Sequence, residues 1–176
     1  VEIHGGWVLD GTGSANGNTV DISGIQGNTV IAGGLVDDGK PGQKGDANNN
    51  TVTVQNSKAT AVVGGHISPD NSGNATGNKV TIHGGEIAGL GDEDEGLAVA
   101  GGHVMGNGSA NNNTVLINND GTVSGNVSGG VSKGGSANGN KVTLKGGTYD
   151  SPSNEVEIHG GQVLDGTGSA NGNTVD

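Results

Sequence analysis

The chain contains a long internal duplication. Residues 156–176 read VEIHGGQVLDGTGSANGNTVD and residues 1–21 read VEIHGGWVLDGTGSANGNTVD, so the two copies differ only where Gln162 replaces Trp7. The copies are offset by 155 residues. Repetition at a fixed period is typical of stacked folds. We therefore expect residues 1–155 to form one complete unit and residues 156–176 to start the next, without a linker, as a window on a longer periodic chain.

A shorter and looser repeat divides this unit. Its marker is Asn, then Thr or Lys, then Val, any residue and usually an aliphatic residue, as in Asn50-Thr-Val-Thr-Val54. A Gly-Gly pair also recurs between successive markers, as at Gly64-Gly65. The marker valines are separated by 32, 28, 35, 27 and 33 residues, which predicts five coils whose lengths differ by loop insertions. These valines are Val20, Val52, Val80, Val115, Val142 and Val175.

The short apolar runs alternate with polar residues, as in Val80-Thr-Ile82-His83. This period of two predicts strands, and 39 glycines disfavour helices. Short strands that recur once per coil predict an all-β fold, a β-solenoid (β-helix) with about five coils per 155-residue unit and roughly three short strands per coil. A single coil cannot bury its apolar face alone, so we expect the marker valines to stack as a ladder in a narrow core.

An Asn stands two places before each marker valine. At one corner of successive coils, side-chain amides can hydrogen-bond to one another along the stack. The alternative is that Asn only forms turns. We favour a structural ladder made by Asn18, Asn50, Asn78, Asn113, Asn140 and Asn173.

The composition restricts the possible partners and activities. The net charge is −11 and the chain has neither Arg nor Cys. Without a basic stripe, we expect no nucleic-acid partner and no membrane insertion by this segment. No triad spacing, phosphate loop or nucleophile elbow is present. Enzymes of this architecture that cleave acidic polysaccharides need Asp clusters with Arg or Lys on a groove, and a chain without Arg has no bidentate group for a sugar carboxylate. We expect no enzyme and no catalytic residue.

The pattern Val-x-Ile-x-Gly-Gly-x-Val, followed by a second Gly-Gly and by Gly-Ser-Ala-Asn-Gly-Asn-x-Val, resembles repeats in passenger regions of bacterial autotransporters and in haemagglutinin-like surface adhesins. The match is best from Val115 to Val142 and looser elsewhere. The resemblance implies export to a bacterial cell surface. We expect a structural segment of a long extracellular fibre that assembles with itself end to end or side by side. The alternative is an adhesin whose outward loops contact host or glycan ligands.

Two histidines are candidates for a site. His66 and His103 each follow a Gly-Gly pair in adjacent coils, so they could lie one strand spacing apart. Stacked imidazoles could hold a metal or respond to pH. A zinc site needs more ligands and none is evident, so we expect a pair of solvated, outward side chains and no metal. His4, His83 and His159 should also face outward, because each comes one residue after an Ile that points inward.

The acidic loops are candidates for calcium. Asp92-Glu93-Asp94-Glu95 is the densest run, with Asp92 and Asp94 as weak ligands, but it lacks the spacing of a calcium loop. We expect a solvated loop and no cofactor. A weaker acidic loop comprises Asp37, Asp38 and Asp46, with Lys40 and Lys44.

Trp7 is the only tryptophan and should face outward next to Leu35 of the following coil. An exposed Trp is a possible contact residue for a sugar or a neighbouring fibre. Its replacement by Gln162 in the second copy indicates that the fold does not require it.

Overall fold

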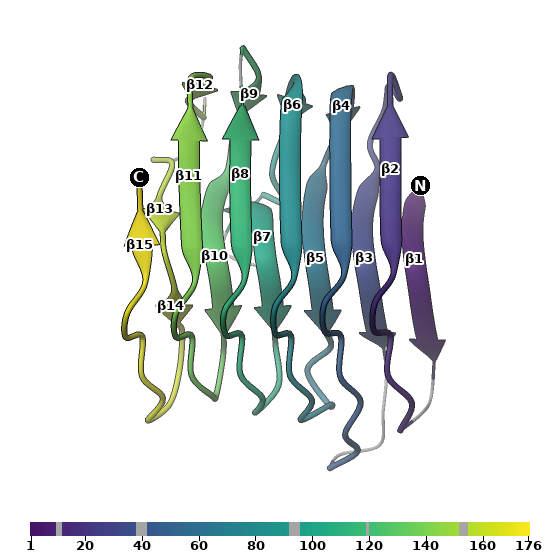
Figure 1. The fold of residues 1–176 in the computed structure, drawn as a ribbon, viewed down its shortest axis with the longest axis vertical. Helices are drawn as coiled ribbons and strands as arrows, with labels where there is room; N and C mark the ends of the chain where they lie inside the picture. The colour runs from purple at the N-terminus through teal and green to yellow at the C-terminus, as the bar shows by residue number, and fades with distance from the viewer. Residues whose placement is uncertain (10–11, 38–41, 92–95, 119, 152–154) are drawn as a thin grey trace.

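A computed structural model describes residues 1–9, 12–37, 42–91, 96–118, 120–151 and 155–176. It confirms the expected all-β β-solenoid of about five turns, built from parallel sheets, and the described residues contain no α-helix. Figure 1 shows two layers of strands, with the chain advancing steadily along one axis from the N-terminus to the C-terminus.

The rear layer in Figure 1 is a seven-stranded sheet in which successive coils pair in parallel. Its strands are β1 (Glu2–Leu9), β3 (Val30–Asp37), β5 (Ala61–Ile67), β7 (Leu97–Val104), β10 (Asn126–Ser132), β13 (Ile158–His159) and β14 (Gln162–Val163).

The front layer is an eight-stranded sheet, also parallel. Its strands are β2 (Thr19–Ser23), β4 (Thr51–Ala59), β6 (Lys79–Ile87), β8 (Thr114–Asn118), β9 (Thr122–Val123), β11 (Lys141–Lys145), β12 (Thr148–Tyr149) and β15 (Thr174–Val175).

A third strand segment arises where β4 and β6 bend. Asn56 (φ 45°) and Gly84 (φ 69°) adopt left-handed backbone conformations that turn the strand. Beyond the bend, β4 still pairs with β6, and β6 pairs in turn with β9. Three strand segments per coil are therefore present in the middle of the stack, in agreement with the sequence.

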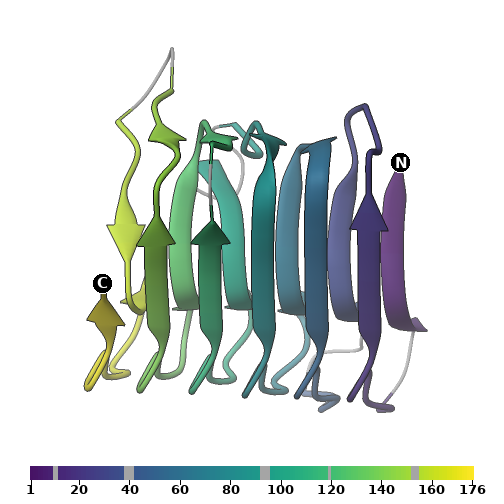
Figure 2. The same ribbon diagram turned by 45° about the horizontal axis from the view of Figure 1, so that its top comes forward.

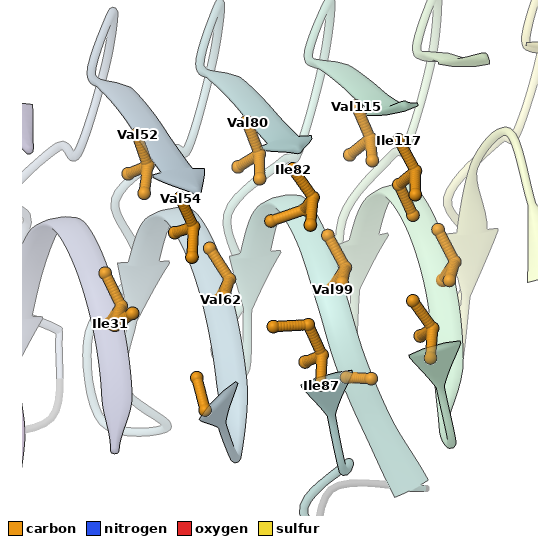
Figure 3. Close-up of a cluster of buried hydrophobic side chains, with 14 of the residues drawn as sticks. Ile31, Val52, Val54, Val62, Val80, Ile82, Ile87, Val99, Val115 and Ile117 are labelled. Carbon is orange, nitrogen blue, oxygen red and sulfur yellow. The ribbon is translucent and has the colours of Figure 1, made fainter. Parts of the chain in front are cut away.

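The marker valines lie directly above one another. Parallel pairing aligns Val20 with Val52, then Val80, Val115, Val142 and Val175. The side chains from Val52 to Val142 are fully buried, with Ile31, Val62 and Val99 of the facing sheet in the same cluster. Figure 3 shows these side chains projecting from both layers into the space between them. A core only two side chains deep has room for aliphatic residues, which explains why the chain lacks Phe.

The Gly-Gly pairs let the backbone approach the opposite corner closely. A Cβ atom added to Gly65 would collide with the carbonyl oxygen of Ala47 and lie 2.7 Å from Nδ2 of Asn78. The same kind of neighbours, an alanine carbonyl and an Asn amide, surround the equivalent glycines Gly34, Gly102, Gly130 and Gly161, whereas Gly6 of the first coil meets only the Asn18 amide. The close packing of the corner thus requires glycine at this position.

Candidate functional site

The six marker asparagines form one row along a corner of the solenoid. The amide of each one donates to Oδ1 of the next at 2.9–3.1 Å, from Asn18 through to Asn173. Each Oδ1 also accepts the backbone N–H of the preceding Asn at 2.8–2.9 Å. The four middle members, Asn50, Asn78, Asn113 and Asn140, are at most 1% exposed. Amides buried to this degree need all their partners, and the row provides them.

The corner that precedes each marker Asn is ordered by further ladders of hydrogen bonds. In Ser-Ala-Asn-Gly-Asn segments, the Ser and first Asn positions accept backbone N–H groups from the next coil. At the Ser position, which Asp46 and Asn74 occupy in the next two coils, Ser14 Oγ accepts the backbone N–H of Asp46, and Asp46 Oδ1 accepts the backbone N–H of Asn74. The Ala positions turn inward and are buried as a second small core cluster, with Ala47 and Ala75 at 0% exposure. Figure 2 shows these corners aligned along one edge of the stack.

Two carboxylates of the expected weaker acidic loop are hydrogen-bonded to the neighbouring coil. Asp46 belongs to the corner ladder, and Asp37 at the end of β3 accepts a hydrogen bond from Ser68 Oγ at 2.8 Å. These carboxylates bond to the neighbouring coil because parallel stacking brings a donor to each. Asp38 and Lys40 lie outside the described residues, as do the calcium candidates Asp92 and Asp94.

The outer face of the seven-stranded sheet carries a groove with a volume of about 270 Å³. Small and aliphatic residues line it, including Ala32, Ala61 and Val63, together with Leu90 from the turn after β6. Next to the groove, Val63 and Leu90 belong to a separate apolar cluster on this outer face, with Leu97, Ala100 and Val131. The polar residues that line the groove are Glu2, His4, Asp37, His66, Ser68 and His103.

His66 and His103 lie side by side in this groove. They are register partners on β5 and β7, their Nδ1 atoms are 3.2 Å apart, and the rings meet edge to face with centroids 5.0 Å apart. The predicted solvated pair is wrong for His103, which is only 2% exposed. Burial, together with the neighbouring His66, lowers the pKa of His103 well below its ordinary value.

The other histidines lie on the outer faces of the sheets. His4 Nε2 is 3.3 Å from Glu2 Oε2, and His159 repeats this arrangement with Glu157 at 3.0 Å. His83 lies on the eight-stranded sheet with its Nδ1 3.4 Å from Asn118 Nδ2. The buried Nδ1 atom of His4 makes no hydrogen bond in the described part of the chain.

Trp7 pairs in register with Leu35, as expected from their equivalent positions after the Gly-Gly pairs, and is 54% exposed. Its ring is tilted against that of His4, with centroids 5.6 Å apart. The side chain therefore stands at the surface of the face that carries the groove. At the equivalent place in the second copy, Gln162 pairs with Val131.

In the described ranges, no cluster brings together three or more His, Cys, Asp or Glu side chains suited to a metal ion. Nor does any helix in this part of the chain have the length and apolarity to cross a membrane.

No protein-family model, no curated protein and no solved structure matches the chain.

Proposed function

We propose that the chain is a non-enzymatic structural segment of a long, secreted or cell-surface bacterial fibre built from tandem β-solenoid units. In this proposal its main partner is a further copy of the same unit. The stiffness comes from the hydrogen bonds and ladders that join each coil to the next.

One observation carries the proposal. The second copy stacks on the fifth coil with the same parallel pairing that joins coils within the unit: β13 and β14 pair with β10, and β15 pairs with β11. The Asn row crosses the same boundary, because Asn140 Nδ2 donates to Asn173 Oδ1 at 3.1 Å. One unit can thus follow another without a change of geometry, and the number of units would set the length of the fibre.

The chemistry of the chain supports an extracellular location. A chain without cysteine has no thiol that could react in an oxidising environment. A net charge of −11 opposes non-specific aggregation of rods whose strand edges would otherwise pair. The resemblance to passenger and adhesin repeats points the same way.

The proposal is tested by the length of tandem chains. Chains with one, two and four copies of residues 1–155 should form rods of constant width in electron micrographs. Each added unit should lengthen the rod by about 24 Å, since paired strands are about 4.8 Å apart. Separate globules joined like beads would contradict the proposal.

A substitution at the boundary between two units tests whether the stacking of one unit on the next keeps the rod straight. In Gly161→Ala the new Cβ would lie 2.5 Å from the carbonyl oxygen of Ala137 and 2.6 Å from Asn173 Nδ2. In the tandem chains this glycine is Gly6 of each following unit, and its substitution by Ala should bend or break the rods once per unit. Thr12→Ala, at a position that is exposed in both copies (Thr12 and Thr167), should leave them straight.

A second candidate function is an adhesin that binds a host surface or glycan. The exposed Trp7 beside the groove favours it, because a flat aromatic face can stack on a sugar ring. Loss of binding to glycan-coated or cell surfaces in Trp7→Gln, with rods intact, would support this function. Unchanged binding would exclude Trp7 from it.

A further inference from the structure

We propose that His66 and His103 form a two-histidine binding site for a divalent transition-metal ion, such as Zn²⁺ or Cu²⁺, in the groove of the seven-stranded sheet. This site is independent of the proposed fibre function.

The spacing of the two rings suits a metal ion. Register pairing of β5 with β7 holds the Nδ1 atoms 3.2 Å apart. Two Zn–N bonds of tetrahedral geometry place their nitrogen atoms about 3.3 Å apart. For binding, the rings must turn so that both Nδ1 lone pairs leave the line between the two nitrogen atoms and point at one ion in the groove.

The protonation of the pair is compatible with binding. Burial and the neighbouring His66 lower the pKa of His103, so this ring is neutral near pH 7. In the form with both rings neutral, the close Nδ1···Nδ1 contact is a hydrogen bond that holds one proton. On metal binding, that proton moves to Nε2 of the same ring, both Nδ1 atoms coordinate the ion, and no proton is released.

The surroundings of the pair favour a cation. Both histidines line the groove, whose volume of about 270 Å³ has room for an ion with its water ligands. The charged groups that share the groove with them are the carboxylates of Glu2 and Asp37, and no Lys is among its described lining residues. The net charge of −11 adds a long-range attraction.

The site is open. In the described residues, no third His, Cys, Asp or Glu completes a cluster with the pair, so water would occupy the remaining positions. Two imidazoles bind less tightly than a closed structural site with four protein ligands. By the usual order of metal affinities, Cu²⁺ should bind more tightly than Zn²⁺.

The test is calorimetric titration of the 176-residue chain with Zn²⁺ and with Cu²⁺ in a weakly coordinating buffer. We expect one ion per chain, and a thermal unfolding midpoint that rises with metal and returns with a chelator. His66→Gln should weaken binding at least about tenfold, on the scale of losses seen when a metal site is damaged. His66 is the preferred variant because it is less buried than His103, and circular dichroism will show whether the fold is kept.

Two controls separate this site from general binding by histidine. His83 lies on the other sheet, and His159 lies on β13 and does not line the groove. His83→Gln and His159→Gln should both bind as the unchanged chain does. Binding that is equally tight in His66→Gln would overturn the proposal. The same conclusion follows if no ion binds at millimolar concentration, or if all three variants lose affinity equally.

Discussion

Asn78 Nδ2 donates to Asn113 Oδ1 at 3.0 Å, across the boundary between two coils that are 35 residues apart in the sequence. Both side chains are buried, and Asn78 Oδ1 in turn accepts from the backbone N–H and the amide of Asn50. One side chain therefore joins three coils. The stack depends on this row in its interior as well as on the backbone ladders.

Replacing Asn78 with Ala should strongly destabilise the solenoid. The change leaves the backbone N–H and the amide of Asn50 without their acceptor in a buried place. Each unsatisfied buried group costs about 1–3 kcal/mol, so the loss of partner for these two groups should lower the free energy of unfolding by at least about 2 kcal/mol. Denaturant unfolding followed by circular dichroism measures the change.

Asn107→Ala is the matched control for this substitution. Asn107 is exposed in the turn after β7, so its replacement should change stability by less than about 0.5 kcal/mol. Equal effects of the two variants would mean that the Asn row contributes no more than ordinary turn residues do.

Gly65→Ala tests the close approach at the Gly-Gly pairs. The added methyl group would collide with the Ala47 carbonyl and press against Asn78 Nδ2 at 2.7 Å, neither of which can move without breaking a ladder. Overpacking of this kind costs about 1–3 kcal/mol or more. Gly13→Ala, with its nearest contact at 3.4 Å, should be neutral in the same unfolding measurement. A neutral Gly65→Ala would show that the corner is looser than described.

The coil number and the core ladder could be predicted from the sequence because both follow from spacing alone. Val52, Val80 and Val115 recur in phase with an Asn and with a Gly-Gly pair, and parallel stacking has only one register that aligns all three. The Asn row was foreseeable for the same reason, since identical amides at one corner can bond to each other.

The ordered corners and the buried histidine were harder to foresee. Segments of Ser, Asn and Gly are typical of turns. Only the alternation of polar residues with Ala15, Ala47 and Ala75 indicates that the alanines form a row pointing inward and that the polar residues form a hydrogen-bonded row between coils. The burial of His103 depends on the outer face of its sheet, where Leu90, from the turn between β6 and β7, lines the same groove and packs in a separate apolar cluster. A strand pattern specifies which face a residue is on and leaves open what covers that face.

Trp7→Gln should leave the fold unchanged. The second copy carries Gln162 at the same place and keeps its parallel pairing with Val131. Because Trp7 is 54% exposed, its removal should change the free energy of unfolding by less than about 0.5 kcal/mol. As the only tryptophan, it should also show the fluorescence of a water-exposed indole. Blue-shifted emission, protected from quenching, would instead indicate that an additional surface covers Trp7.

Tyr149 should ionise at a higher pH in the folded chain than in the unfolded one. Its ring packs against the main core cluster, its hydroxyl donates to the Gly146 carbonyl at 3.0 Å, and burial raises its pKa. Tyrosine in an unfolded chain titrates near about pH 10. The neutral phenol therefore favours the folded state: this contribution is complete below that pH and is lost as the pH rises through the folded pKa.

Because Tyr149 is the only tyrosine, the ultraviolet absorbance of tyrosinate reports on this residue alone. The titration midpoint should lie higher in native buffer than in concentrated urea. Stability measured by denaturant unfolding should decline with alkaline pH more steeply in the unchanged chain than in Tyr149→Phe, which retains the ring and lacks the titrating group. Identical midpoints in buffer and in urea would mean that the hydroxyl is fully hydrated in the folded chain and that β12 does not pack against the core.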